Sequence, residues 1–370
     1  MRVLYASRGY TPHDFRFLEA LTATGHEIHF VGFDPGRKLE SRPFPARISS
    51  IKWLNGIHKP RLFAFFLREV QLRDHIRTIK PDLVHAGPIQ GVSALFALLR
   101  FQPLVSMSWG SDLLLQGRRR FGRWVAEFTL NHSDALICDA ECVKAEALAM
   151  GYPPEKTIVL PWGVDLKLFQ PGPTPQLRQK LGWQDCFVFI CTRNWEPIYG
   201  VENVLDAFLQ ASVKIPKARL MMVGSGSLER ELKMRIENSM AASKVALVGR
   251  VEYPELPDYY RSADVYISAS YSDGSSVSLL EAMASGMPVL VSEIPGNMEW
   301  IRSEQQGQTF SAGDVPALAS KMVAMAQNPT GWKGAGLLNR RIAEDRANWE
   351  RNVSLLDHAY SLALGAGLDE

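Results

Sequence analysis

Cysteines and long apolar runs are both scarce in this sequence, and each scarcity excludes a class of protein. The chain has only four cysteines, Cys138, Cys142, Cys186 and Cys191, in or beside apolar segments at spacings unlike a zinc ribbon. We therefore expect buried free thiols rather than a metal or redox site. No apolar run reaches the roughly 18 residues that span a bilayer, and the first residues lack the apolar core of a signal peptide. The expected location is the cytoplasm.

Charge of one sign is in only slight excess, since the formal net charge is +2 at pH 7. The excess is uneven: residues 1–165 carry 21 basic and 16 acidic side chains, a net of +5, and the remainder carries 20 and 23, a net of −3. Basic side chains gather at 61–80, where apolar residues recur at near-helical spacing, and at Arg118, Arg119 and Arg120. Such segments suit contact with an anionic membrane or acceptor, and the alternative is a helix with one solvated face. We expect no nucleic-acid partner.

Two ligand-binding signatures are also missing. Gly224 and Gly226 follow an expected strand, but they form a lone GxG and not the complete GxGxxG fingerprint of a dinucleotide site. This absence disfavours a nicotinamide-dependent oxidoreductase. Asp273 has no carboxylate two residues away, whereas enzymes that neutralise a departing diphosphate with Mg2+ or Mn2+ need grouped carboxylates. We expect no metal and no cofactor.

The length and the pattern of the chain predict two α/β domains. The 370 residues exceed one ordinary core, so two domains of about 150 to 200 residues are expected. Short apolar runs alternate with helical patterns, which predicts parallel sheets covered on both faces. The expected strands are 3–6, 27–31, 83–86, 104–107, 135–138, 157–160, 187–192, 219–223, 245–248, 265–268 and 289–292. A Pro- and Gly-rich stretch, Asp165–Pro175, is expected to link domain 1–165 to domain 166–340.

The segment from Ser272 to Pro295 carries the strongest functional signal. Asp273 is followed by small residues at 274–276, then by a helix with a second carboxylate, Glu281, and then by an apolar strand. Small residues let ligand oxygens approach the backbone, and the helix start presents unpaired N–H groups that suit a phosphate. Glu281 lies in an otherwise apolar helix, so its charge needs hydrogen-bond donors such as a pair of sugar hydroxyls. Together these features indicate a nucleotide sugar.

The same segment resembles glycosyltransferase family 4. Asp273 to Val289 matches that family's acidic pair with seven residues between, followed by Ala-Met-Ala-x-Gly-x-Pro-Val, with Asp in place of the usual first Glu. Further matches lie at 7–32, 103–112, 134–169 and 222–233. The resemblance implies a retaining, metal-independent enzyme with two facing Rossmann-like domains, the GT-B fold. It also implies that residues 341–370 form a terminal helix that crosses back onto the first domain.

Arg193, at the end of the first strand of the second domain, is the expected catalytic cation. Departure of a nucleoside diphosphate leaves negative charge on the β-phosphate. A guanidinium can stabilise this charge through two N–H donors. The alternative is a structural salt bridge. The resembled family usually has a lysine a few residues later, but this chain has Glu196-Pro197-Ile198-Tyr199. Tyr199 or a cation elsewhere is expected to substitute.

The remaining donor contacts follow from the rule that ligands of open parallel sheets lie beyond the carboxyl ends of the strands. The expected contacts are Gly9, Tyr199, Gly224, Gly226, Gly249, Arg250, Gly274, Ser275, Ser276, Val277 and Ser278. Asp273 is expected to accept hydrogen bonds from the transferred sugar, or else to form an Asx turn. Glu281 is expected to accept hydrogen bonds from sugar hydroxyls, or else to form a buried ion pair.

On the acceptor side, His85 and Asp112 also follow expected strands. His85 is expected to contact acceptor or sugar, and the alternative is a structural histidine. Asp112 is expected to act as a base or hydroxyl acceptor, and the alternative is a helix N-cap. The resembled family commonly places a histidine where this chain has Trp109.

Together these expectations predict a retaining glycosyltransferase that moves a sugar from a nucleoside diphosphate to a glycan or lipid-linked acceptor, as in polysaccharide biosynthesis. Domain 1–165 is expected to bind the acceptor and domain 166–340 the donor. A peripheral position on the inner membrane face is a further expectation. Two alternatives remain open: a nucleotide-sugar epimerase of the same architecture, and a non-catalytic nucleotide-sugar-binding homologue, which the replacements at Trp109, Tyr199 and Asp273 would suit.

Overall fold

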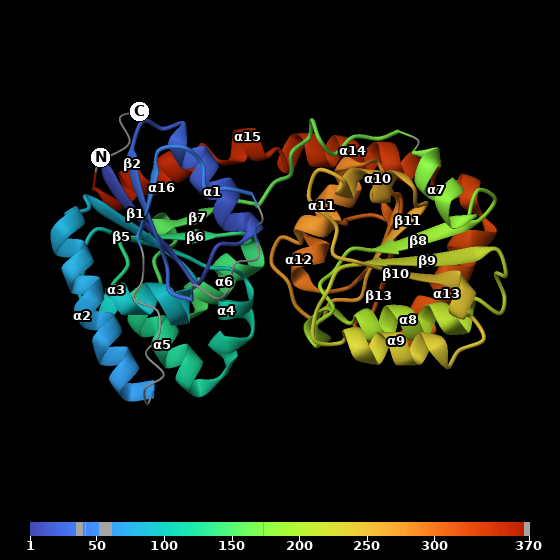
Figure 1. The fold of residues 1–370 in the computed structure, drawn as a ribbon, viewed down its shortest axis with the longest axis horizontal. Helices are drawn as coiled ribbons and strands as arrows, with labels where there is room; N and C mark the ends of the chain where they lie inside the picture. Colours follow the sequence, from blue (N-terminus) through green and yellow to red (C-terminus); the bar gives the residue numbers. More distant parts are fainter. Residues whose placement is uncertain (35–39, 41, 52–60, 173, 366–370) are drawn as a thin grey trace. The chain divides into compact units, whose positions relative to one another are not determined.

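The computed structural model describes residues 1–34, 40, 42–51, 61–172 and 174–365. The chain divides into two compact units: Met1–Leu160 with Val353–Glu370 form unit 1, and Pro161–Asn352 form unit 2. Each unit is built on one parallel sheet with helices on both faces (Figure 1). The expected fold class is confirmed.

Unit 1 contains a seven-stranded sheet in the order β3-β2-β1-β4-β5-β6-β7, and all of its neighbouring strands are parallel. The strands are β1 (Arg2–Ser7), β2 (Glu27–Gly32), β3 (Ile48–Ile51), β4 (Leu83–Ala86), β5 (Leu104–Met107), β6 (Ala135–Cys138) and β7 (Thr157–Val159). Strand β3, at one edge, is an addition to the expected set.

The helices of unit 1 are divided between the two faces of this sheet. They are α1 (Pro12–Thr22), α2 (Arg61–Ile79), α3 (Ala94–Leu98), α4 (Ser111–Leu114), α5 (Arg120–Leu130), α6 (Glu141–Ala149) and α16 (Leu355–Ala363), with short turns η1 (Ile89–Ser93), η2 (Gln116–Arg118) and η3 (Pro154–Lys156). Because side chains alternate along a strand, Leu4 of β1 packs with Leu72 of α2, whereas Tyr5 contacts Phe17 of α1. In the basic stretch 61–80, the side chains of residues 61–69 lie outside the described residues.

Unit 2 contains a six-stranded parallel sheet in the order β10-β9-β8-β11-β12-β13. The strands are β8 (Phe187–Cys191), β9 (Ala218–Val223), β10 (Val245–Gly249), β11 (Val265–Ser268), β12 (Val289–Ser292) and β13 (Gly307–Phe310). The order places β8, β9 and β11 side by side at the centre, so the loops that follow them share one edge of the sheet.

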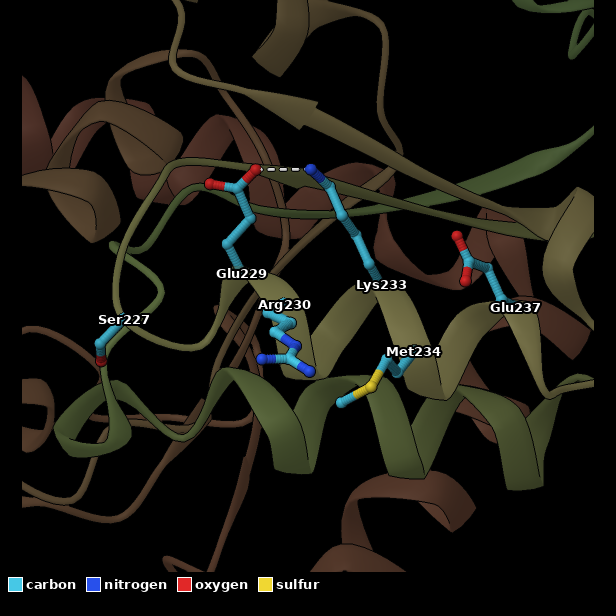
Figure 2. A pocket seen from close by; sticks show the side chains of 6 residues that line it. All are labelled: Ser227, Glu229, Arg230, Lys233, Met234 and Glu237. Atoms are coloured by element: carbon cyan, nitrogen blue, oxygen red, sulfur yellow. Dashed lines mark hydrogen bonds and ion pairs between the residues drawn. The ribbon is translucent and has the colours of Figure 1, made fainter.

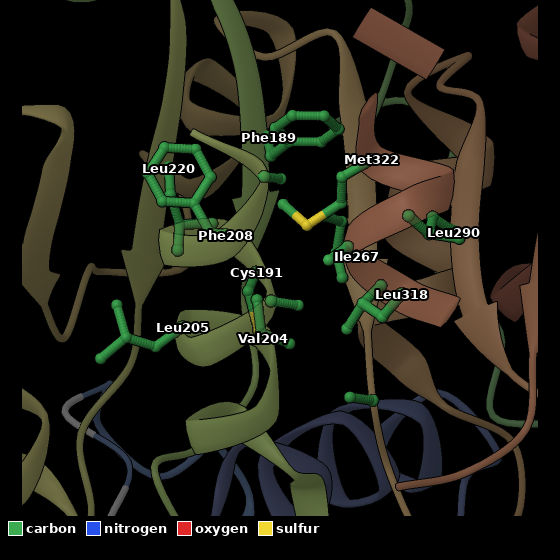
Figure 3. Packing of buried hydrophobic residues seen from close by; sticks show 14 of the residues in the cluster. Phe189, Cys191, Val204, Leu205, Phe208, Leu220, Ile267, Leu290, Leu318 and Met322 are labelled. Carbon is green, nitrogen blue, oxygen red and sulfur yellow. The ribbon is translucent and has the colours of Figure 1, made fainter. Parts of the chain in front are cut away.

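Two apolar cores cover the two faces of the unit 2 sheet. The helices and turns are α7 (Pro175–Leu181), η4 (Pro197–Tyr199), α8 (Val201–Ala211), α9 (Glu229–Glu237), η5 (Ala242–Lys244), α10 (Leu256–Arg261), α11 (Val277–Ala284), α12 (Pro295–Met298), α13 (Val315–Gln327), η6 (Pro329–Trp332), α14 (Lys333–Arg346) and α15 (Trp349–Asn352). On one face, Phe189 and Ile267 of the sheet pack with Phe208 of α8 and Met322 of α13 (Figure 3). Helices α10, α11 and α14 contribute to the core on the other face.

The boundaries between the units differ from those that the sequence suggested. The expected linker 165–175 belongs to unit 2, because Phe169 is fully buried in the core of that unit. Residues 341–352 also remain in unit 2, where Ala343 is buried in the same core, and only α16 lies in unit 1. The sequence boundaries at 165/166 and 340/341 therefore become 160/161 and 352/353. Proline and glycine mark a break in regular structure, but core contacts decide where a compact unit ends.

All four cysteines are in the thiol form. Cys138 and Cys191 are buried as expected, whereas Cys142 and Cys186 are only half-buried. No helix in the described part of the chain is long and apolar enough to cross a membrane.

Candidate active site

The expected phosphate cradle follows β11 and ends in the first turn of α11. Ser276 occupies the N-cap position of α11, but its hydroxyl makes no capping hydrogen bond to the helix. That hydroxyl instead accepts a hydrogen bond from Arg193 Nη1 at 2.6 Å. The positive end of the helix therefore lies beside a guanidinium, and this combination suits an anion.

Arg193 is buried at the centre of this cluster, with 7% of its surface exposed. Its Nη1 also donates to Ser278 Oγ at 3.0 Å, and its Nη2 lies 2.6 Å from Asp273 Oδ2 in an ion pair. Burial is the largest effect and disfavours the charged form, but Asp273 together with Tyr199, Tyr266 and Cys191 outweighs it and raises the pKa of Arg193 above its ordinary value. Arg193 Nε has no hydrogen-bond partner among the described residues. An unpartnered buried donor next to an uncapped helix start is consistent with a ligand that supplies an acceptor.

Tyr199 contacts the flat face of the same guanidinium. The Arg193 Cζ atom lies 4.0 Å from the centroid of the Tyr199 ring, a cation–π contact. Tyr199 is at the end of η4 and is followed by Gly200, where α8 is about to begin. The residue expected to replace a lysine therefore adds no second cation and instead orients the first.

Glu281 lies on α11 and is 5% exposed. The hydroxyl of Tyr260 donates to Glu281 Oε2 at 2.8 Å and lies 2.7 Å from Thr192 Oγ1. Burial and the Glu281 charge raise the pKa of Tyr260 well above its ordinary value, so its hydroxyl stays protonated and remains a donor. Tyr260 thus fixes one oxygen of the carboxylate, a contact that the sequence did not indicate.

The two glycines after β9 are required by close backbone packing. A Cβ atom on Gly224 would lie 2.4 Å from the carbonyl oxygen of Arg193, and one on Gly226 would lie 2.3 Å from that of Trp195. These glycines therefore let the loop after β9 pack against the loop that carries Arg193. Gly249 has open space around its Cα, and its carbonyl accepts a hydrogen bond from Gly224 N–H at 2.9 Å. The structure thus brings the residues after β8, β9 and β10 together.

A surface depression of about 530 Å3 lies farther along this edge, next to α9. Its lining consists of Ser227, Glu229, Arg230, Lys233, Met234 and Glu237 (Figure 2). Glu229 and Lys233 form an exposed ion pair of 2.6 Å across one turn of the helix. None of the expected site residues lines this depression, and the Lys233 and Glu229 side chains of its ion pair are 54% and 46% exposed. We therefore place the candidate site at Arg193, where the polar groups are buried and convergent.

In unit 1, the loop after β1 holds Gly9 and leads into α1. Helix α1 begins with a capping box in which Thr11 and Asp14 bond each other's backbone N–H groups. Gly9 is buried in this loop. Burial raises the pKa of Asp14 to about 6, against the opposing effect of hydrogen bonds from Thr11 and Tyr5. Asp14 therefore ties the start of α1 both to Thr11, at the end of this loop, and to Tyr5 of β1, just before the loop.

His13, in the first turn of α1, is a candidate that the sequence analysis missed. Its imidazole lies edge-on to the ring of Trp109, with 6.0 Å between centroids and 82° between planes. Burial and the nearby Arg16 lower the pKa of His13 to about 3, so the ring is neutral at pH 7. This chain lacks a histidine at position 109, but the start of α1 places the His13 imidazole beside Trp109. The rule of inspecting residues just after each strand would have found it.

Asp112 and His85 take structural positions. Asp112 accepts hydrogen bonds from Ser108 Oγ at 2.6 Å and from the backbone N–H groups of Ile89, Trp109 and Leu113 at 2.9 to 3.1 Å. It therefore ties the loop after β5 to the loop after β4. His85 is fully buried within β4, and its Nδ1 lies 2.9 Å from the hydroxyl of Tyr360 in α16. Neither side chain offers surface to an acceptor.

Across the described ranges, no group of three or more His, Cys, Asp or Glu side chains is arranged to hold a metal ion.

Comparison with known proteins identifies the family. The family model "Glycosyl transferases group 1" matches residues 173–349, and the model "Glycosyltransferase Family 4" matches residues 13–168. This chain belongs to the glycosyltransferases of group 1 and family 4, and its two parallel sheets are those of the GT-B fold.

Among its relatives is the sulfoquinovosyl transferase SQD2 of Arabidopsis thaliana, 25% identical over 82% of this chain and 59% of that protein. Another is the alpha-monoglucosyldiacylglycerol synthase of Acholeplasma laidlawii, 24% identical over 84% of this chain and 83% of that protein. The chain spans between 52% and 59% of the length of three of its curated relatives.

The fold is also that of Anabaena HepE in a crystal structure with UDP-glucose. The TM-score is 0.82 at 18% identity, over 98% of this chain and 99% of that one.

Proposed function

We propose that this protein transfers a hexosyl group from a nucleoside diphosphate sugar to a glycan or lipid-linked acceptor, with retention of the anomeric configuration. The observation that carries the proposal is the buried Arg193, which is held by Asp273, Ser276 and Ser278 at the uncapped start of α11. A guanidinium and a helix N-terminus together favour the charge that develops on a departing diphosphate.

In the proposed reaction, the bond between the sugar C1 and the β-phosphate oxygen breaks, and its electron pair leaves with that oxygen. Arg193 and the first-turn N–H groups of α11 stabilise the resulting charge without a metal ion. The acceptor hydroxyl oxygen bonds to C1 on the same face, and its proton is taken up by the departing diphosphate. The leaving group is already acidic, so fixing both reactants close together supplies much of the remaining rate.

The other side chains of the cluster are assigned to binding and orientation. Glu281, whose carboxylate is held by Tyr260, accepts hydrogen bonds from hydroxyls of the donor. Asp273 holds Arg193 and accepts from the transferred sugar. The loops after β9 and β10, with Gly226 and Arg250, flank the nucleotide.

In unit 1, we assign to His13, beside Trp109, the contact with sugar or acceptor. A neutral imidazole can both donate and accept a hydrogen bond, so it suits a hydroxyl. The proposed acceptor class is supported by the name of the Acholeplasma laidlawii relative, which states a glucosylated diacylglycerol. We place the reaction in the cytoplasm, in polysaccharide or glycolipid biosynthesis.

Donor binding followed by turnover tests the proposal. UDP-glucose is the first donor to use, because HepE was crystallised with it, and GDP- and ADP-sugars follow. We expect one class to bind and to be hydrolysed slowly, with release of nucleoside diphosphate and a sugar of unchanged anomeric configuration.

Two results would reject a transferase. Incorporation of solvent deuterium into the donor sugar without an acceptor would indicate an epimerase. Tight donor binding without hydrolysis or transfer to any lipid or glycan acceptor would indicate a non-catalytic homologue.

A further inference from the structure

Helix α5 presents two large aromatic rings to solvent. Its inner side chains, including Ala126 and Leu130, are buried against the unit 1 core. On its outer side, Phe121 is 75% exposed and Trp124 is 61% exposed. Their rings stack, with 6.0 Å between centroids and 28° between planes, and Trp124 also stacks on Phe128 at 6.2 Å. Single exposed apolar residues are ordinary, but adjacent exposed aromatic rings indicate a contact surface.

Three arginines stand at the start of the same helix. Arg118, Arg119 and Arg120 are all exposed, and the Arg118 side chain remains 67% exposed although it pairs with Glu146. Within the described ranges, neither Arg119 nor Arg120 lies at ion-pair distance from an acidic side chain. We call Arg118, Arg119, Arg120, Phe121 and Trp124 the α5 surface.

The α5 surface is held in place by close packing. A Cβ atom on Gly122 would lie 2.2 Å from the carbonyl oxygen of Gln116, so the first turn of α5 lies directly against η2. Arg123 pairs with Glu127 at 2.8 Å and donates to the Ala149 carbonyl at 2.9 Å, which ties α5 to the end of α6. The aromatic and basic side chains therefore project from a fixed backbone, which lowers the entropic cost of binding.

We propose that the α5 surface docks unit 1 on an anionic lipid bilayer. Phe121 and Trp124 enter the boundary between headgroups and acyl chains, where Trp and other amphipathic aromatic side chains are favoured. The three arginines contact lipid phosphates, because basic residues are attracted to an anionic surface. Unit 1 also has a net positive charge: residues 1–160 carry 21 basic and 15 acidic side chains and residues 353–370 carry three acidic ones, a net of +3 that adds a long-range attraction to an anionic surface.

A second copy of the chain is a poorer occupant of this surface. A two-fold interface places the same patch against itself. Stacked aromatic rings would tolerate that arrangement, but the clusters at Arg118, Arg119 and Arg120 would then face each other, and like charges across an interface are costly. An anionic bilayer offers an apolar boundary to the rings and phosphate groups to the arginines.

Vesicle flotation tests the docking without any activity measurement, so its outcome is independent of the proposed reaction. The full chain is mixed with vesicles of phosphatidylcholine, alone or with phosphatidylglycerol, at low and high salt. We expect wild type to float with the anionic vesicles. The variant Phe121→Ser/Trp124→Ser should bind at least about tenfold more weakly at both salt concentrations, because the apolar contribution is not screened.

A variant of the three arginines tests the electrostatic contribution to vesicle binding. Arg118→Gln/Arg119→Gln/Arg120→Gln should lose binding at low salt and differ little from wild type at high salt. The matched control is Val213→Ser/Met240→Ser, which removes two exposed apolar side chains of unit 2 that are 77% and 102% exposed and should leave binding unchanged. Quenching by brominated lipid should be weaker in Trp124→Phe than in wild type.

Three outcomes would overturn the proposal. Wild type that does not float with anionic vesicles would show that unit 1 has no such affinity. Equal losses in the control and in the aromatic variant would show that the effect is not specific to α5. Self-association of wild type that the aromatic variant abolishes, measured by sedimentation velocity without lipid, would assign the surface to a second copy.

Discussion

Arg193 and Asp273 form an ion pair of 2.6 Å between the ends of two neighbouring strands, β8 and β11. Both side chains are largely withdrawn from solvent, with 8% and 21% of each exposed. A partly buried pair of this kind is costly to break from one side, because the remaining charge is left uncompensated. The pair therefore fixes the guanidinium in one direction before any ligand arrives.

Replacing Arg193 should lower turnover more than it lowers stability. We expect Arg193→Ala to reduce kcat by about 10²- to 10³-fold, the usual cost of one preorganised donor at a developing oxyanion. Arg193→Lys should keep part of the rate, because a lysine retains the charge but loses the paired donors. The measurement is steady-state kinetics with the donor that binds best.

The control for Arg193 is Arg178→Ala. This change also removes a half-buried ion pair from unit 2, since Arg178 Nη2 lies 2.8 Å from Asp264 Oδ2. It should lower the melting temperature while kcat stays near that of wild type. Similar losses of kcat in both variants would mean that Arg193 acts through folding alone.

Tyr199 should act mainly through its ring. Tyr199→Phe keeps the aromatic face against the guanidinium and should leave kcat nearly unchanged. Tyr199→Ala removes the contact, worth about 0.5 to 2 kcal/mol, and should lower kcat by roughly twofold to thirtyfold. Equal kinetics for the alanine and phenylalanine variants would contradict the orienting role.

Glu281 should control donor affinity. Glu281→Gln weakens hydrogen bonds from donor hydroxyls to a charged acceptor, so we expect the donor Kd to rise by about tenfold or more. Isothermal titration with the intact donor measures the change. Glu344→Gln is the control, because Glu344 is an exposed partner of Arg340 on α14 and should leave Kd unaltered.

His13 should affect transfer and not donor binding to unit 2. We expect His13→Ala to lower kcat at least about tenfold with the donor Kd unchanged, because losing a hydrogen bond worth about 1.4 kcal/mol in the transition state lowers a rate about tenfold. The double variant His13→Ala/Trp109→His should recover part of the rate, because it returns an imidazole to the neighbouring position. Full activity of His13→Ala would remove this residue from the site.

The buried His85 should make unit 1 less stable in acid. Burial lowers the pKa of His85 to about 3 from an ordinary 6.5. Below pH about 6.5 the unfolded chain binds a proton at His85 that the folded chain excludes, so stability falls as pH falls, by up to about 1.4 kcal/mol per pH unit.

Calorimetry of wild type and His85→Gln between about pH 7 and pH 5 measures this effect. The variant keeps a polar partner for Tyr360 but does not titrate. The difference in melting temperature between the two proteins should therefore shrink or reverse as pH falls. A difference that stays constant across the range would show that His85 is not the titrating group.

The interior strands could be predicted from the sequence because their patterns are strong. Strands β4, β5, β6, β11 and β12 have the expected bounds. The two strands that were missed, Ile48–Ile51 and Gly307–Phe310, are the edges β3 and β13 of their sheets. An edge strand has one neighbour and one exposed side, so it tolerates polar residues such as Ser49 and Gln308 and lacks a continuous apolar run.

The roles of single polar residues were harder to predict. His85 and Asp112 follow the same sequence rule as Arg193, since all three lie at or near strand ends. The structure encloses His85 against Tyr360 and fixes Asp112 with backbone N–H groups. Position along the chain indicates which edge of a sheet a residue is near, but not whether its side chain faces a helix or solvent.

The sequence by itself determined the alternation of strands and helices, the small-residue loop before Glu281 and the family of the chain, because these depend on residues close together along the backbone. Tertiary structure decided that Arg193 meets Asp273 and Ser276, that His13 lies beside Trp109, and that the chain leaves unit 2 only after Asn352. Such contacts depend on which strands become neighbours and on which face each side chain points to. Local pattern does not encode strand order, and the packing of the whole core selects it.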